Sequence, residues 1–224
     1  LKRLITEGIK LLITCDTGMG NHKEVSYVTQ EGMDVIITDH HDVPSTLPKA
    51  HSIVNPKMLS EGHPLRELPG VGCAYKVMEE LYRKAKRSDE IYRYLDLVAL
   101  GIVSDVVVQT GDTRYLLQKG LKVLRNTERI GLRLMMEKAG LNPGRISEEH
   151  IGFGLGPRLN ALGRLSDANL AVELLTTENP ERARILIDML EGFNERRKVL
   201  GEQVLQAAIH QIELNPELLD YEAI

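Results

Sequence analysis

The chain has 224 residues, and its 28 Lys and Arg against 32 Asp and Glu give a formal net charge of −4. With 42% hydrophobic and 27% charged residues it has the composition of a globular protein, which excludes disorder as its main state. No apolar run approaches the roughly 18 to 20 residues of a membrane span, and the N-terminus lacks the pattern of a signal peptide. We therefore expect a cytoplasmic protein without a membrane partner.

The first sixty or so residues predict a parallel sheet. The apolar run 11–16 ends in an aspartate and a glycine-bearing turn, as a buried parallel strand does. A helix over 21–30 and a second strand over 34–39, which also ends in an aspartate, complete a β-α-β unit, and 52–56 is a third predicted strand. Because parallel strands end at one edge of a sheet, the two aspartates are expected side by side.

The rest of the chain is predicted to be mainly helical. Apolar residues recur at helical spacing in the segments 74–85, 92–103, 114–125, 130–139, 167–176 and 181–214. Ser147 is expected to cap the start of a further helix. The last segment is much longer than the roughly 11 to 12 residues of an average helix, so we interpret it as a connector between domains. Its predicted apolar stripe consists of Leu186, Leu190, Phe193, Leu200 and Val204.

The most informative side chains follow the second predicted strand, where Asp39 precedes His40 and His41. Consecutive side chains diverge at a strand end, so one imidazole can bind a metal while the other faces a substrate. These residues alone are equally compatible with a polar turn. Asp16 at the same sheet edge and Asp105 after an apolar stretch add two more carboxylates. Such oxygen and nitrogen ligands favour Mn²⁺ or Mg²⁺ over zinc.

Several motifs resemble those of the DHH phosphoesterases, a superfamily named for the Asp-His-His of residues 39–41. The matching stretches, in the expected order, are 15–18, 39–41 and 101–107. Within that superfamily, Gly-Leu-Gly-Pro-Arg-Leu-Asn-Ala-Leu-Gly-Arg-Leu at 154–165 closely resembles the signature of the RecJ family, single-strand-specific 5′ to 3′ DNA exonucleases. Residues 69–76 and 193–197 are similar to that family as well.

The resemblance implies a phosphodiesterase with two Mn²⁺ or Mg²⁺ ions. In such families the aspartate matching Asp16 bridges the ions, and those matching His40 and Asp105 bind one of them. His41 would lie near the scissile phosphate, and Asp39 would orient the histidines. The implied substrate is single-stranded DNA, the implied processes are DNA repair and recombination, and the implied partners are a single-strand-binding protein and a helicase.

Four residues are candidates for contact with the nucleic acid. Arg158 and Arg164 lie in a stretch without an acid between residues 151 and 166, as a phosphodiester backbone requires; a tight helix junction is the alternative. Asn160 could donate to phosphate or cap a helix, and for Arg197 a solvated helix face and DNA contact both stay open. With no Trp and two Phe, base stacking would fall to Tyr residues or to a further domain.

The expected fold class is α/β, with a parallel-sheet DHH-type core followed by a helical subdomain and a long connector helix. The predicted divisions are the core at 1–110, the subdomain at 111–180, the connector at 181–215 and the start of a further domain at 216–224. We expect a fragment, because the chain begins with Leu1 and ends in the strand-like run 219–224.

The resemblance implies that the fragment lacks the family's first motif and its C-terminal DHH-associated domain, and is inactive alone. Val108 and Gln109 stand where the family usually has Pro-Leu.

Two other functions stay open. One is a DHH phosphodiesterase for oligoribonucleotides or cyclic dinucleotides, against which the Gly-Pro-Arg stretch argues. The other is a catalytically inactive replication or repair scaffold, against which the intact acids and histidines argue. Cys15, beside Asp16, is expected to be a small buried side chain rather than a nucleophile.

Overall fold

A computed structural model describes residues 1–221 and divides them into two compact units. Unit 1 comprises residues 1–127 and 143–152, and unit 2 comprises residues 128–142 and those from 153 onward. Each unit is therefore assembled from two separate stretches of chain, and each is described by itself below. The domain boundaries predicted at residues 110 and 180 stay predictions.

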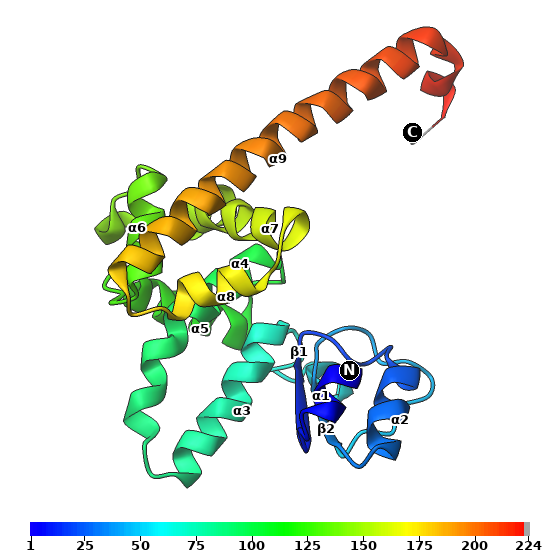
Figure 1. The fold of residues 1–224 in the computed structure, drawn as a ribbon, viewed down its shortest axis with the longest axis vertical. Helices are drawn as coiled ribbons and strands as arrows, with labels where there is room; N and C mark the ends of the chain where they lie inside the picture. The colour runs from blue at the N-terminus through cyan, green and yellow to red at the C-terminus, as the bar shows by residue number, and fades with distance from the viewer. Residues whose placement is uncertain (222–224) are drawn as a thin grey trace. The chain divides into compact units, whose positions relative to one another are not determined.

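Unit 1 contains a parallel sheet whose strands lie in the order β1-β2-β3. Figure 1 labels the first two of these strands. The three predicted strands are confirmed as β1 (Leu11–Cys15), β2 (Asp34–Thr38) and β3 (Ser52–Val54). The helix α2 (His22–Gln30) connects the first two strands, as the β-α-β pattern predicted. A short helix, α1 (Lys2–Thr6), precedes β1 and was not predicted.

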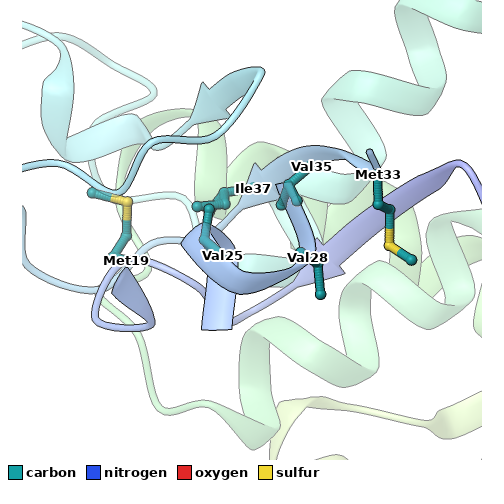
Figure 2. Packing of buried hydrophobic residues seen from close by; sticks show 6 residues of the cluster. All are labelled: Met19, Val25, Val28, Met33, Val35 and Ile37. Carbon is teal, nitrogen blue, oxygen red and sulfur yellow. The ribbon is translucent and has the colours of Figure 1, made fainter. Parts of the chain in front are cut away.

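A compact apolar core joins α2 to the sheet. It consists of six side chains that are each at most 4% exposed: Met19, Val25, Val28, Met33, Val35 and Ile37 (Figure 2). Fully burying an aliphatic side chain of this size stabilises a protein by roughly 1.5 to 3 kcal/mol. This core holds the end of β2 in place, and the Asp-His-His segment begins at the next residue.

β1 is less buried than predicted. Leu11 and Ile13 are 47% and 48% exposed, and Cys15, which we expected to be buried, is exposed as well. Alternate residues of a strand point to opposite faces of a sheet, so these three residues share one face. In the part of the chain that the structure describes, that face meets solvent. The apolar run predicted burial on both faces, and only one is covered.

Three helices complete most of unit 1: α3 (Gly70–Lys84), α4 (Leu95–Ser104) and α5 (Gly111–Leu124). The predicted segment 92–103 divides between the end of a 3₁₀ helix and α4. α4 and α5 pack so closely that a Cβ on Gly120 of α5 would lie 2.3 Å from the main-chain oxygen of Leu95 in α4. Asp105 follows the last residue of α4.

Unit 2 is a stack of helices, namely α6 (Ile130–Lys138), α7 (Gly156–Leu165), α8 (Asn169–Thr176) and α9 (Pro180–Leu214). The predicted helical segments 130–139, 167–176 and 181–214 are confirmed. At the start of α9, the side chain of Asn179 accepts hydrogen bonds from the N–H groups of Glu181 and Arg182. An asparagine in this position satisfies main-chain donors that the helix leaves unpaired.

α9 buries only its first half. Leu186 and Leu190 are at most 1% exposed, and beyond Asn194 every residue of the helix is exposed or half-buried. The predicted apolar stripe is therefore open at Leu200 and Val204, which are 38% and 69% exposed. Although α9 has 35 residues, no helix among residues 1–221 is both long and apolar enough to cross a membrane.

The glycine- and proline-bearing signature at 154–165 is helical throughout. A helix starts at residue 148, directly after Ser147 as predicted, and continues as the π-helix His150–Leu155 into α7. Pro157 is the second residue of α7 and lies where the π-helix passes into the α-helix. Residues 148–165 are thus helical without a break.

The strand predicted to begin at residue 219 is not found. Pro216–Asp220 form a 3₁₀ helix, in which the N–H of Leu218 donates to the carbonyl of Asn215. A proline at the start of a helical turn favours this conformation, because its φ is already close to the helical value. Residues 222–224 of the predicted strand lie outside the described residues.

Candidate metal centre

The ends of the three parallel strands bring the candidate residues to one edge of the sheet. The last residue of β1, Cys15, pairs in register with Thr38, which in turn pairs with Val54 of β3. The next residues continue this pattern, since the N–H of Asp16 donates to the Thr38 carbonyl at 2.9 Å and the N–H of Asp39 to the Val54 carbonyl at 3.1 Å. The two strand-end acids therefore lie on neighbouring strands at one edge, as predicted.

Three of the candidate side chains meet in unit 1. His40 Nε2 lies 2.9 Å from Asp16 Oδ1 and 3.4 Å from Asp105 Oδ2. The side chain of His40 is 17% exposed, and those of Asp16 and Asp105 are 51% and 37% exposed. One imidazole thus sits between two carboxylates that remain open to solvent and to a ligand.

Asp39 is buried and accepts four hydrogen bonds. Its Oδ2 accepts from the N–H of Met19 at 2.9 Å, and its Oδ1 accepts from the N–H groups of His40 and His41 at 2.8 and 3.3 Å. The fourth contact joins Oδ1 to Nδ1 of His41 at 2.7 Å. Burial alone would raise the pKa of Asp39, but these hydrogen bonds outweigh it and hold the pKa below its ordinary value. Asp39 is therefore a fixed anion that orients its neighbours.

His41 lies on the open side of the cluster, with a side chain that is 64% exposed. Its hydrogen bond to Asp39 raises the pKa of His41 above the ordinary value for histidine. The ring centroids of His40 and His41 lie 4.8 Å apart, and ligating atoms of Asp16, His40 and His41 all fall within 4.8 Å of one another. Because Nδ1 is engaged by Asp39, Nε2 is the atom that can reach a ligand.

The main chain is strained at Asp16 and at the residue that follows Asp105. Asp16 has a φ of +61°, and Val106, the residue after Asp105, has a φ of +56°. A left-handed conformation is costly for a β-branched residue such as valine, and strain of this kind clusters at functional sites. Asp105 itself follows the last turn of α4, where its N–H donates to the Gly101 carbonyl at 3.0 Å. The direction of both carboxylates is thus set by the main chain.

The electrostatics of the cluster suit a divalent cation. Burial raises the pKa of Asp16, and the nearby charge of Asp105 raises it further while His40 opposes the rise. The two carboxylates thus repel one another. A bound cation would reverse this balance, because it favours the charged form of both carboxylates. Oxygen and imidazole ligands fit Mn²⁺ or Mg²⁺.

Arg158 differs from the prediction that it is an uncompensated cation. Its Nε lies 2.7 Å from Oε1 of Glu191, and its Nη1 donates to the Gly154 carbonyl at 2.8 Å. The two charged side chains are 16% and 22% exposed. Glu191 belongs to α9, so the acid that neutralises Arg158 lies far outside the stretch in which we looked for one. Arg158 therefore joins two helices of unit 2, and its contact with nucleic acid stays a prediction.

The other predicted contacts to nucleic acid also belong to unit 2. Asn160 and Arg164 are exposed on α7, and because Asn160 lies inside that helix it does not cap one. Arg197 is half-buried, and its Nη2 donates to Oδ1 of Asn194 at 3.2 Å. Asn160 and Arg164 thus keep exposed polar groups for a ligand, whereas Arg197 has a partner in its own helix.

Two residues of interest were missed by the sequence analysis. Gly70, at the start of α3, approaches Asp16 so closely that a Cβ on it would lie 2.4 Å from Oδ1. Phe153, in the π-helix, is 84% exposed, although we had expected aromatic stacking only from Tyr residues or from a further domain. The one signal for Gly70 was its place in the family-like stretch 69–76, which does not reveal the contact with Asp16, and the exposure of Phe153 does not follow from a local pattern.

The comparisons with known proteins agree with this geometry. Residues 1–102 match the N-terminal domain of the DHH family. The single-stranded-DNA-specific exonuclease RecJ of Bacillus subtilis is 37% identical over 206 residues, which are 92% of this chain and 26% of that protein. The corresponding enzyme of Escherichia coli is 37% identical over 210 residues, 89% of this chain and 36% of that protein.

The structural relatives point the same way. A crystal structure of RecJ in complex with Mn²⁺ from Thermus thermophilus superposes with a TM-score of 0.84 at 30% identity, covering 94% of this chain and 32% of that one. A crystal structure of exonuclease RecJ bound to manganese gives a TM-score of 0.83 at 30% identity, covering 94% of this chain and 54% of that one. The expected DHH-type core is confirmed, and the chain spans about a quarter to a third of the two curated relatives.

Proposed function

We propose that this DHH-family protein is a metal-dependent exonuclease that hydrolyses single-stranded DNA from the 5′ end. The premise is that residues 1–102 match the DHH family and that about nine tenths of the chain is similar to RecJ. The observation that carries the proposal is the approach of His40 Nε2 to both Asp16 and Asp105, at 2.9 and 3.4 Å. A scaffold without catalysis would not need two repelling carboxylates beside one imidazole, with Asp16 on strained main chain, which argues against that alternative.

Asp16, His40 and Asp105 are the residues proposed to hold the metal. When bound, a pair of Mn²⁺ or Mg²⁺ ions lowers the pKa of an attacking water and offsets the charge on the leaving oxygen. The two RecJ crystal structures, both of which contain manganese, support this assignment. Since one imidazole and two carboxylates do not fill the shells of two ions, water and phosphate oxygens would complete them.

His41 is proposed to contact the phosphate, and Asp39 is proposed to position His41. The hydrogen bond to Asp39 favours protonated His41, which can then donate from Nε2 to a phosphate oxygen. Asp39 holds the imidazole in that orientation and is itself held by the N–H of Met19. This pair would therefore place a positive charge opposite the scissile group, while Asp39 stays out of contact with the substrate.

Single-stranded DNA is the proposed substrate. Asn160 and Arg164 would contact the sugar-phosphate backbone, which carries no base information, so little sequence preference is expected. Phe153 offers an aromatic surface on which a base can stack. We also propose a role in DNA repair and recombination, a single-strand-binding protein and a helicase as partners, and the cytoplasm as the compartment.

The experiment is to replace Asp16 by Asn in the complete protein and to follow Mn²⁺-dependent release of nucleotides from 5′-labelled single-stranded DNA. Removing a group that stabilises transition-state charge costs on the order of 10³-fold in rate, and we expect a loss of that size. Asp34→Asn is the matched control, because Asp34 lies at the other end of β2 with a 70% exposed side chain. Unchanged turnover by Asp16→Asn would remove this residue from the site.

The same assay separates the remaining alternative. An enzyme for oligoribonucleotides or cyclic dinucleotides would hydrolyse those substrates faster than long single-stranded DNA, and it would show no requirement for a free 5′ end. A single-strand exonuclease shows the opposite preference, and it does not degrade a blunt duplex of the same sequence.

A further inference from the structure

The first turn of α3 packs directly against the candidate metal centre. A Cβ built on Gly70 would lie 2.4 Å from Oδ1, 2.5 Å from Cγ and 2.6 Å from Cβ of Asp16. Non-bonded heavy atoms are most stable at about 3.5 to 4.0 Å, so even the smallest side chain at this position would overlap Asp16. The carboxylate thus occupies space that exists only because residue 70 has no side chain.

We propose that Gly70 is a positioning residue, which sets the distance between the Asp16 carboxylate and His40 through the bare Cα at the start of α3. The inference rests on the proposed function, since it concerns the same metal centre. It differs from a general requirement for glycine at a helix start, because the atoms in conflict belong to one proposed metal ligand.

The structure indicates which partner would move if residue 70 gained a side chain. The first turn of α3 is anchored by Leu68, Cys73 and Tyr75, which are 4%, 2% and 5% exposed. The Cys73 thiol also donates to the Asp39 carbonyl at 3.7 Å, which ties α3 to the end of β2. Asp16, by contrast, is half exposed and lies on strained main chain at the edge strand.

Rotation of the Asp16 side chain would not relieve the overlap. Its own Cβ would be 2.6 Å from the new atom, and the position of Cβ does not change with the side-chain torsion. The end of β1 must therefore shift, by about 1 Å to restore an ordinary contact. Ligand positions in metal sites are held to within about 0.2 Å, so a shift of this size exceeds what the site tolerates.

The test is the Mn²⁺ affinity of Gly70→Ala in the complete protein, measured from the free-ion signal in electron paramagnetic resonance. Losing an interaction that orients a metal ligand costs about 10- to 100-fold in affinity, and we expect a loss in that range. The melting temperature of the metal-free protein is measured alongside, because a purely structural defect would lower it without a separate effect on metal binding.

Two further glycines provide matched controls. Gly72 lies in the same turn of α3, but a Cβ there would meet the Leu68 side chain at 3.0 Å instead of Asp16. Gly120→Ala creates an equally severe overlap within unit 1, at 2.3 Å from the Leu95 carbonyl and away from the metal centre. We expect Gly72→Ala to bind Mn²⁺ within about twofold of the wild type, and Gly120→Ala to lower the melting temperature with little loss of affinity.

A double-variant cycle covers the case in which Gly70→Ala does not fold alone. Asp16→Gly removes the three atoms that lie nearest to the new Cβ and suits a φ of +61°. Gly70→Ala should therefore cost stability in the wild-type background and almost none in the Asp16→Gly background. An equal cost in both backgrounds would show that the overlap involves other residues, and would overturn the proposal.

The outcomes for the two proposals can be told apart. If Asp16→Asn binds Mn²⁺ as tightly as the wild type, the proposed metal centre is wrong. If Asp16→Asn weakens binding while Gly70→Ala does not, the centre stands and the positioning role of Gly70 is overturned. That role is also overturned if Gly120→Ala loses as much affinity as Gly70→Ala at a matched loss of melting temperature.

Discussion

One charged cluster in unit 1 and one in unit 2 are built in opposite ways. At the edge of the sheet in unit 1, Asp16 and Asp105 share a single imidazole and remain partly open. In unit 2 the charge of Arg158 is matched by that of Glu191, at 2.7 Å. The negative charge left unbalanced in unit 1 is what a divalent cation can use, whereas a balanced pair stabilises the helices that contain it.

The difference also shows what a family motif can mean. The stretch 154–165 resembles a nuclease signature, and its first arginine, Arg158, pairs with Glu191 within unit 2. Its second arginine, Arg164, is exposed and can contact a ligand. One motif therefore combines a residue that holds the helices together with another that is free to bind, and the sequence alone does not separate the two.

The largest effect is expected from Arg158→Ala, which leaves Glu191 without its partner. Removing one member of a buried ion pair costs about 3 to 5 kcal/mol, and because this pair is slightly exposed we expect about 3 kcal/mol of unfolding free energy. Chemical denaturation measures it, with the exposed Arg164→Ala as the control. Unchanged stability together with a weaker salt dependence of DNA binding would instead return Arg158 to the DNA-contacting residues.

Asp39→Asn should have an intermediate effect, confined to the metal centre of unit 1. Asparagine keeps the shape but replaces one accepting oxygen with an N–H₂ group, which cannot pair with the donors that Asp39 now binds. We expect about 10- to 100-fold weaker Mn²⁺ binding, as for other groups that orient metal ligands. Asp42→Asn, at a 94% exposed side chain, serves as the control and should bind normally. Equal affinities would deny Asp39 its orienting role.

The smallest effect is a difference in pH response between the units. The Asp39 hydrogen bond raises the pKa of His41 above 6.5, so its stabilisation is complete below pH about 6.5 and is lost as pH rises through the raised pKa. The Arg182 hydrogen bonds lower the pKa of Glu173 below 4.5, so that stabilisation is present above pH 4.5 and is lost in acid. His41 and the Arg182–Glu173 pair are open to solvent, which keeps the effects small, although Asp39 itself is buried.

Nuclear magnetic resonance titration of the metal-free protein checks both signs. The His41 midpoint should lie above 6.5 in the wild type and move towards 6.5 in Asp39→Asn, while the Glu173 midpoint stays where it was. In Arg182→Gln the Glu173 midpoint should rise and that of His41 should not change. Joint movement of the two midpoints would mean that the units do not titrate independently.

Much of the fold could be predicted because the signals are local. Apolar runs ending in acids predicted β1 and β2, and the rule that parallel strands end at one edge predicted that Asp16 and Asp39 lie on neighbouring strands. Asp105 was different, since it reaches His40 from the end of α4 and was assigned its role by resemblance. The structure adds the distances, without testing the proposed catalytic roles.

What could not be predicted depends on contacts between distant residues. Glu191 neutralises Arg158 from 33 residues further along the chain, so a search for acids near the arginine missed it. The contact of Gly70 with Asp16 likewise joins the start of α3 to the end of β1. Exposure of one face of β1 was missed because an apolar run does not tell whether one or both of its faces are covered.

The partial burial of α9 has a consequence for how firmly its amide protons are held. Around Leu186 and Leu190 the helix is supported by packing, whereas beyond Asn194 its support comes from pairs along the helix itself, such as Lys198 with Glu195. Such pairs contribute about 0.2 to 0.5 kcal/mol each. Protection from hydrogen–deuterium exchange should therefore decline steadily from the first turns of α9 to its last.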